Sequence, residues 1–278
     1  MKKAKIQSAF LKGIVFASVG ITITALTFII GYILIKGVPH LSLDLFSIKY
    51  TSENVSLFPS LINTITMTAL SLLIAVPLGV FSAIYLVEYA KRGNKLVAIV
   101  RTTTETLSGI PSIVYGLFGY LLFVVYLGWG YSILAGAVTL SIMILPVIMR
   151  TTEEALKSIS DSFREGSYGL GAGKLRTVFK IVLPSAVPGI LAGIVLSVGR
   201  IVGETAALIY TAGTVAQIPN SLFGSGRTMS IHMYALWKEG FNPDESYATA
   251  VVLLIIVIGL NALSAFIAKR ISKGKTSE

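Results

Sequence analysis

Two residues of opposite charge interrupt a long apolar stretch in the second half of the chain. Arg200 and Glu204 are the only charged residues between positions 182 and 210. A charge near the centre of a bilayer costs roughly 2.5–3.5 kcal/mol, so such residues face a partner or a water-filled path. Because they stand four positions apart, on a helix they share a face and can pair. The pattern favours a functional site, and its alternative is a structural salt bridge that locks two helices together.

The rest of the sequence excludes most other chemistry. The chain has no cysteine, and His40 and His232 lie in separate polar stretches, which excludes thiol chemistry, disulfides and a multi-His metal site. The sequence contains no Walker A pattern, no Gly-x-Ser-x-Gly and no paired aspartates in its apolar runs. We therefore expect no catalytic residue, no metal and no cofactor on this chain, and any ATP-driven work must be done by another chain.

The elements that would position the charged pair are membrane spans. The 278 residues are 54% hydrophobic and 13% charged, against about 25% charged in globular proteins, and the mean hydropathy is +0.80. A transmembrane helix needs about 20 mostly apolar residues. The apolar runs, the longest of them divided by a Gly-Trp-Gly turn, predict six spans at about residues 14–35, 61–87, 107–127, 131–149, 182–210 and 247–268.

The basic residues set the expected orientation. Most of the 23 Lys and Arg residues precede the first span, separate spans two and three, follow span four or end the chain. Lys36, Lys49, Arg227 and Lys238 lie on the opposite side, and Arg200 lies within a span. The positive-inside rule therefore places both termini in the cytoplasm. The net charge of +10 needs no nucleic-acid partner to explain it.

Two polar connections are long enough to matter. The cytoplasmic one, residues 150–181, is predicted to be helix, break and helix, because Ala155, Ile159 and Phe163 recur at four-residue spacing before a glycine-rich interruption. Its apolar stripe suits docking into a partner's groove or packing against the chain's own bundle. The outer connection, residues 211–246, is long enough to meet an extracytoplasmic partner.

The cytoplasmic connection resembles the EAA loop of ABC importer permeases, whose pattern is Glu-Ala-Ala-x3-Gly-x9-Ile-x-Leu-Pro. Every spacing of that pattern is matched here, by Glu165, Gly166, Ser167, Gly171, Ile181, Leu183 and Pro184. Gly166 and Ser167 depart from the usual alanines and have a lower helix propensity. The resemblance implies that these residues couple the chain to a separate ATPase.

Three further segments resemble the permeases of phosphate importers, namely residues 108–116, 199–208 and 227–234. The compact length and the short first outer loop favour the PstA type over its PstC-type partner. The resemblance implies an all-α membrane protein with the six-helix bundle of type I (MetI-like) ABC importer permeases. One permease domain would cover residues 1–278, with its core at about 61–268 and the coupling loop at 150–183.

The resemblance also implies an assembly. One PstA-like and one PstC-like permease would combine with two copies of an ATPase, which bind ATP and Mg²⁺, and with an extracytoplasmic phosphate-binding protein in a prokaryotic cytoplasmic membrane. Arg200 would offer paired N–H donors to a phosphate oxygen, a geometry that lysine does not supply. Glu204 would hold Arg200 between transport events, and further positive donors would come from the partner permease.

Two other functions stay open at this point. The chain could be the ABC permease of another oxyanion, such as molybdate, tungstate or sulfate. It could also be an ion-driven secondary carrier, although such carriers are expected to show inverted repeats and several midplane ionisable groups, and this sequence has one Arg–Glu pair and no visible repeat.

Overall fold

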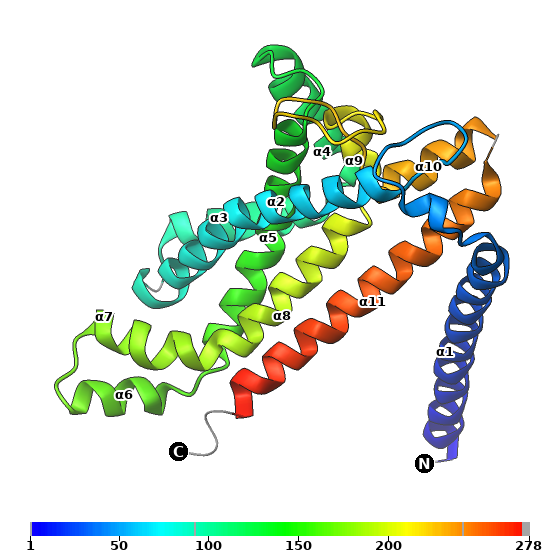
Figure 1. Cartoon of the computed structure of the whole chain (residues 1–278). Helices are drawn as coiled ribbons and strands as arrows, with labels where there is room; N and C mark the ends of the chain where they lie inside the picture. Colours follow the sequence, from blue (N-terminus) through cyan, green and yellow to red (C-terminus); the bar gives the residue numbers. More distant parts are fainter. Residues whose placement is uncertain (1, 92, 241, 274–278) are drawn as a thin grey trace.

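The computed structural model describes residues 2–91, 93–240 and 242–273, and every regular element within these ranges is helical (Figure 1). By length and composition, the described chain has five helices able to cross a membrane, or six if one bent pair counts as a span. The five contain α1 (Lys2–Gly37), α2 (Phe58–Ile84), α5 (Ile133–Lys157), α8 (Leu183–Val202) and α11 (Pro243–Lys273). The all-helical, membrane-spanning fold predicted from the sequence is confirmed.

Helix α5 lies at the centre of the bundle. It begins where the Ser132 hydroxyl accepts the Ala135 N–H at 3.2 Å, an N-cap bond, and it packs against both α2 and α8 (Figure 1). Glycine allows the close approach on both sides. A Cβ on Gly79 of α2 would lie 2.7 Å from Ile148, and one on Gly193 of α8 would lie 1.9 Å from the Thr151 hydroxyl. Ile148 belongs to the main core, which combines apolar residues of α2, α5 and α8 with others from α4, α9 and α10.

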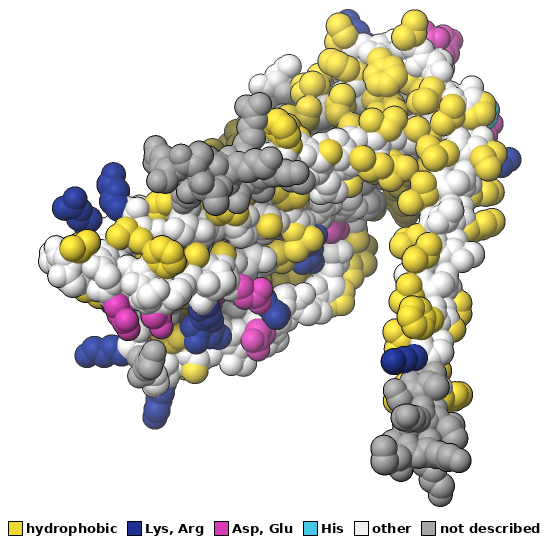
Figure 2. Space-filling model, turned by 90° about the horizontal axis from the view of Figure 1, so that it is seen from below, with side chains coloured by type: hydrophobic (Ala, Val, Ile, Leu, Met, Phe, Trp, Pro, Cys, Tyr) yellow, Lys and Arg dark blue, Asp and Glu magenta, His cyan; other side chains and the backbone are white. Residues whose placement is uncertain are grey.

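Helix α1 stands apart from this bundle (Figure 1). The apolar window of its span is 0% buried, and Figure 2 shows hydrophobic side chains along its length. Its last residue, Gly37, meets α11 closely, because a Cβ there would lie 2.4 Å from the Tyr247 carbonyl oxygen. The apolar surface of α1 therefore faces lipid or another subunit, since this chain does not cover it.

The structure corrects two of the six predicted spans. The third begins with a sharp corner, since α3 (Lys95–Ser108) and the helix from Ser112 to Tyr126, which contains α4 (Ser112–Gly119), are bent by 103°. Pro111 accounts for the corner because it disfavours helical geometry in the residue before it. The fifth span, predicted to run to 210, ends at Val202, and a short helix α9 (Ala206–Thr211) follows.

The connection after α5 forms two helices that project from the bundle (Figure 1). They are α6 (Asp161–Gly169) and α7 (Lys174–Thr177), and α7 runs through a π-helical turn into α8. The predicted helix, break and helix are confirmed, except that α5 ends at Lys157, so Ile159 lies in a turn rather than in the first helix.

At the opposite end, the connection after α9 contains α10 (Met229–Glu239), a helix that the sequence does not predict.

Candidate functional site

Arg200 lies in the last turn of α8, on a face that the chain leaves uncovered. The exposed positions of α8 recur at helical spacing, at Gly189, Ala192, Leu196 and Arg200, whereas the neighbouring Ile201 is buried in the core. Since the guanidinium is on this exposed stripe, it faces either a water-filled path or another subunit.

Glu204 lies in the break between α8 and α9 rather than on α8. Its Oε1 accepts the backbone N–H of Ala207 at 3.0 Å, in the first turn of α9, and its carbonyl oxygen accepts a hydrogen bond from the Ser230 hydroxyl. Among the residues that the structure describes, Arg200 and Glu204 form no ion pair. The predicted i, i+4 pairing is therefore wrong, because Gly203 and Glu204 leave the helix before the spacing applies.

The two broken spans meet beside Arg200. A Cβ on Gly116 of α4 would lie 2.7 Å from the Cα of Ala207 in α9, so these helices are in backbone contact. The Tyr115 hydroxyl donates to the Leu107 carbonyl at 2.8 Å across the α3–α4 corner and lies within electrostatic range of Arg200. The predicted motif of residues 108–116 and the charged residues of 199–208 are thus brought to one place by the fold.

A pocket of about 440 Å³ lies next to this place, between α3, α5 and α8. Leu196, one helical turn before Arg200, forms part of its wall. Its charged lining residues are Arg101, Glu105, Arg150, Glu153, Glu154 and Lys157. Its lining extends from Ser108, the last residue of α3, to Lys157, the last residue of α5.

The coupling-loop residues adopt a compact turn between α6 and α7. Gly171 has a φ of +80°, a conformation that only glycine adopts readily, and its N–H donates to the Tyr168 carbonyl at 2.9 Å. Ser167 is buried, and its hydroxyl lies 2.8 Å from that of Thr177 in α7. The serine that departs from the EAA pattern therefore joins the two helices of the loop.

The other residues of the motif fall into two groups. Glu165 and Gly166 are exposed on α6, while Leu183 and Pro184 begin α8. Ile181 lines a pocket of about 380 Å³ with Leu170, which is 91% exposed, and Arg176. The loop thus presents an apolar surface with a basic rim that this chain does not cover.

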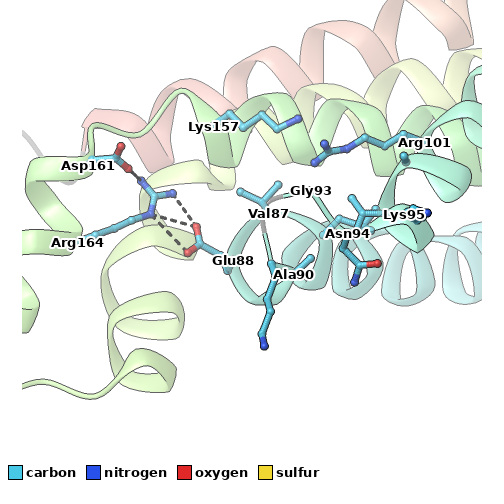
Figure 3. Close-up of a pocket in the computed structure, with 14 residues that line it drawn as sticks. Val87, Glu88, Ala90, Gly93, Asn94, Lys95, Arg101, Lys157, Asp161 and Arg164 are labelled. Atoms are coloured by element: carbon cyan, nitrogen blue, oxygen red, sulfur yellow. Dashed lines mark hydrogen bonds and ion pairs between the residues drawn. The ribbon is translucent and has the colours of Figure 1, made fainter.

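Arg164 and Glu88 form an ion pair that the sequence does not indicate, since the two residues are 76 positions apart. Arg164 of α6 approaches the Glu88 carboxylate at 2.6 Å, and the side chains are 14% and 5% exposed. Figure 3 shows its guanidinium between Glu88 and Asp161. Arg164 also donates to the carbonyls of Leu156 and Ile159 in the α5–α6 turn, at 3.1 and 2.9 Å. The Glu88 hydrogen bond raises the pKa of Arg164 further above its usual value, so the guanidinium stays charged.

Comparison with known proteins places these features in a family context. Residues 75–277 match the family model described as binding-protein-dependent transport system inner membrane component. A probable ABC transporter permease of Bacillus subtilis, YqgI, is 35% identical over 88% of this chain and 90% of its own length. The phosphate transport system permease protein PstA of Pasteurella multocida is 33% identical over 92% of each chain, and PstA 1 of Mycobacterium tuberculosis strain H37Rv is 36% identical over 76% of this chain and 68% of its own.

Solved structures show the same fold. A subunit of a bacterial alginate ABC transporter aligns with a TM-score of 0.67 at 19% identity, over 94% of this chain and 95% of its own. A chain of the MetNI methionine ABC transporter in an inward-facing conformation aligns with a TM-score of 0.60 at 22% identity, over 77% of this chain and 94% of its own. The predicted MetI-like bundle is therefore confirmed.

Proposed function

Because the chain belongs to the family of binding-protein-dependent transport system inner membrane components, we propose that it is the permease subunit of an ATP-driven importer of inorganic phosphate. The observation that carries the cargo assignment is the similarity to PstA proteins over most of both chains. The geometry supports it, because Arg200 lies at the meeting point of two broken spans, on a helix face left open by this chain. Irregular backbone at membrane depth is tolerated where it lines a cavity.

In this proposal Arg200 binds the phosphate ion on its passage. A guanidinium presents paired N–H donors that match two oxygens of an oxyanion. Glu204 has a structural part, since its carboxylate caps α9 and fixes the break next to Arg200. One arginine is little charge for a divalent anion, so a second, PstC-type permease supplies further positive donors from the face opposite α8.

The α6–α7 loop is the proposed contact with the ATPase. Its exposed Leu170 and basic rim suit insertion into a groove of a partner. We place both termini on the same side as this loop, in the cytoplasm of a prokaryotic cell, because most Lys and Arg residues gather there. ATP and Mg²⁺ then bind to an ATPase dimer, phosphate arrives from an extracytoplasmic binding protein, and the whole chain acts as one permease domain without a cofactor of its own.

Uptake of radiolabelled phosphate tests the proposal. Cells that express the complete transporter with Arg200→Gln are expected to lose phosphate uptake. The control Lys36→Gln, which removes one positive charge from the last turn of α1, is expected to retain it. An excess of molybdate, tungstate or sulfate should leave phosphate uptake unchanged. Normal phosphate uptake in a stably assembled Arg200→Gln transporter would remove the role of Arg200, and efficient competition by another oxyanion would reassign the cargo.

A further inference from the structure

The connection between α1 and α2 contains a closed loop, residues 47–56, that lies beside α10 (Figure 1). Its two ends are joined, because the Leu57 N–H donates to the Leu45 carbonyl at 2.8 Å. Both leucines are buried in one apolar cluster with Met229 of α10. Surface loops of this length with closed ends are Ω-loops, which are frequently functional. We call residues 47–56 the flap, and Leu45 with Leu57 its base.

Hydrogen bonds hold the flap together as one unit. The Asn54 Oδ1 accepts the backbone N–H groups of Thr51 and Ser56, at 2.9 and 3.1 Å. The Asn54 Nδ2 donates to the Lys49 carbonyl at 2.9 Å, and the Ser56 hydroxyl donates to the Ser47 carbonyl at the other end of the flap. Because these bonds are internal, the flap can move about its base without losing them.

The flap covers a buried arginine at the start of α10. The Arg227 guanidinium lies 4.8 Å from the centre of the Tyr50 ring, and the same ring packs edge-on against His232 at 6.1 Å. Arg227 is 4% exposed and His232 is 0% exposed. In the part of the chain that the structure describes, Nε and Nη2 of Arg227 and both ring nitrogens of His232 have no hydrogen-bond partner, and Arg227 forms no ion pair. A guanidinium keeps its charge in proteins, and a cation–π contact compensates only part of the cost of burying it.

The closed flap also contains a strained residue. Val55 has a φ of +46°, a conformation that β-branched side chains rarely adopt. It is 2% exposed, and its backbone lies beside His232. Strain of this kind occurs at clamps and switch segments, where the surrounding contacts maintain it. The closed position therefore combines a strained backbone with an uncompensated charge, and both are relieved when the flap lifts while its apolar base stays buried.

We propose that the flap lifts from α10 and exposes Arg227 as a binding group for an inorganic oxyanion. In the closed position the Tyr50 ring covers the guanidinium, so an ion reaches Arg227 only after the flap has lifted. Arg227 then offers unpaired N–H donors, and a neutral His232 offers one ring N–H. The N-terminus of α10, directly after Arg227, also favours an anion.

The position of the site suits an ion on its way into the transporter. Under the proposed orientation α10 lies at the outer end of the bundle, opposite α6 and α7 (Figure 1). Ser230, in the first turn of α10, donates to the Glu204 carbonyl, so the site adjoins the helix break beside Arg200. The proposal rests on the proposed function for the identity of the ion, which is phosphate.

Thiol labelling tests the proposal, because the chain has no native cysteine. Val55→Cys places a thiol in the flap where the side chain is enclosed, and Ala248→Cys places one in the apolar cluster at the base, where the native residue is 0% exposed. The purified full-length chain, with the subunits that copurify with it, is treated with N-ethylmaleimide. We expect Val55→Cys to react several-fold faster in millimolar phosphate than in sodium chloride of equal ionic strength, because the ion stabilises the lifted state. Ala248→Cys should react slowly in both.

A second measurement leaves the buried residues unchanged. Spin labels on Ser52→Cys, at the exposed tip of the flap, and on Glu239→Cys, at the exposed end of α10, report the distance between the flap and the helix. Phosphate should shift this distance to longer values than chloride does.

Three variants, each combined with Val55→Cys, assign the effect to its residue. Arg227→Gln should abolish the acceleration by phosphate. Lys238→Gln removes the same charge from the other end of α10, where the ammonium lies 5.8 Å from the centre of the Tyr234 ring, and should retain the acceleration. Arg200→Gln should also retain it, although this variant loses uptake under the proposed function, so the failures of the two proposals are distinguishable.

Four outcomes would overturn the proposal. They are equal reaction of Val55→Cys in phosphate and chloride together with an unchanged spin-label distance, an equal acceleration of Ala248→Cys, which indicates that the whole outer connection opens, an acceleration that survives Arg227→Gln, and an acceleration that is lost in Arg200→Gln, which assigns the effect to the translocation site.

Discussion

The guanidinium of Arg164 lies 2.6 Å from the carboxylate of Glu88 and joins helix α6 to the π-helical turn that ends α2. The two residues are 76 positions apart, and both side chains are largely buried. The same guanidinium donates to two carbonyls of the α5–α6 turn. In the proposed transporter, a displacement of α6 by the ATPase would therefore reach α2 and α5 through one side chain.

Breaking this pair should damage both stability and coupling. Arg164→Gln leaves the Glu88 carboxylate buried without its partner, which costs about 3–5 kcal/mol for a well-buried pair. We expect a lower thermal unfolding midpoint and less phosphate uptake per ATP hydrolysed by the reconstituted transporter. The reversed pair, Glu88→Arg with Arg164→Glu, should recover part of the stability.

The control for that experiment is an exposed ion pair. His40 and Asp244 lie 3.5 Å apart with side chains 42% and 53% exposed, and such pairs contribute about 0–1 kcal/mol. Asp244→Asn should change neither the unfolding midpoint nor the uptake. Equal effects of Arg164→Gln and Asp244→Asn would contradict the role of the Arg164–Glu88 pair.

Substitutions of Glu204 separate its capping from its charge. Glu204→Ala removes the acceptor of the Ala207 N–H, and loss of a helix cap costs about 1 kcal/mol. Glu204→Gln retains an acceptor oxygen and should retain most of the stability. If Glu204→Gln also retains phosphate uptake, the carboxylate acts only by fixing the break, whereas loss of uptake with intact stability assigns a part in transport to its charge.

Glycine substitutions in the coupling loop should have opposite signs. Gly171→Ala forces a residue with a Cβ into a φ of +80°, at a cost of about 1–2 kcal/mol, and we expect weaker copurification of the ATPase. Gly166→Ala lies in α6 with no atom within 4 Å of the added Cβ and should stabilise that helix by up to about 1 kcal/mol.

Gly173→Ala is the neutral comparison for the coupling loop. Its residue has an ordinary φ of −74° and open space around the added Cβ. Limited proteolysis of the loop in the three variants measures the order of stability directly. A loop that is cleaved equally fast in Gly171→Ala and Gly173→Ala would show that the turn is not under the conformational constraint that we infer.

His232 should make the part of the protein around α10 sensitive to acid. Burial, and secondly the charge of Arg227, lower the pKa of this histidine to about 3, while it is about 6.5 in an unfolded chain. Below pH 6.5 the unfolded state therefore binds a proton that the folded state does not. Stability is then fully present above pH 6.5 and falls by up to about 1.4 kcal/mol per unit as the pH decreases toward 3.

Unfolding midpoints at pH 7.5, 6.0 and 5.0 measure this contribution. His232→Phe should flatten the decrease, because the Tyr50 ring that packs edge-on against His232 at 6.1 Å can pack against another aromatic ring. His40→Gln, at an exposed histidine, should leave the decrease as in the wild type. A wild-type decrease in His232→Phe would assign the acid sensitivity to other groups.

The sequence was sufficient for the features that depend on hydropathy and local spacing. Four of the six spans, the turn at residues 128–130 and the break around Gly171 follow from such local signals, and the structure has each of them. Hydropathy did not locate the break in the fifth span, because the residues on both sides of Gly203 and Glu204 are equally apolar. The corner before Pro111 has a local signal, since proline restricts the preceding residue, but the predicted third span, residues 107–127, runs through it.

Ion pairs between residues far apart in the chain could not be predicted from local sequence patterns. Nothing near Glu88 in the chain indicates Arg164, and the contact arises because α5 returns the chain to the end of α2. The i, i+4 argument for Arg200 and Glu204 failed for a related reason, since it assumed an unbroken helix. Ser167 replaces an alanine of the EAA pattern, and its hydrogen bond with Thr177 shows that the serine links α6 to α7.

The central position of α5 has a consequence for how mutations of this protein will sort. Two thirds of its most apolar stretch is buried by other helices. Substitutions between Ile133 and Met149 should therefore destabilise the protein and be found in genetic screens as variants with low expression. Variants that reach the membrane in normal amounts yet transport nothing should instead collect at the helix interruptions and along the open side of α8. A map of expression against activity would thus separate α5, where variants lose expression, from the helix interruptions and the open side of α8, where they lose activity.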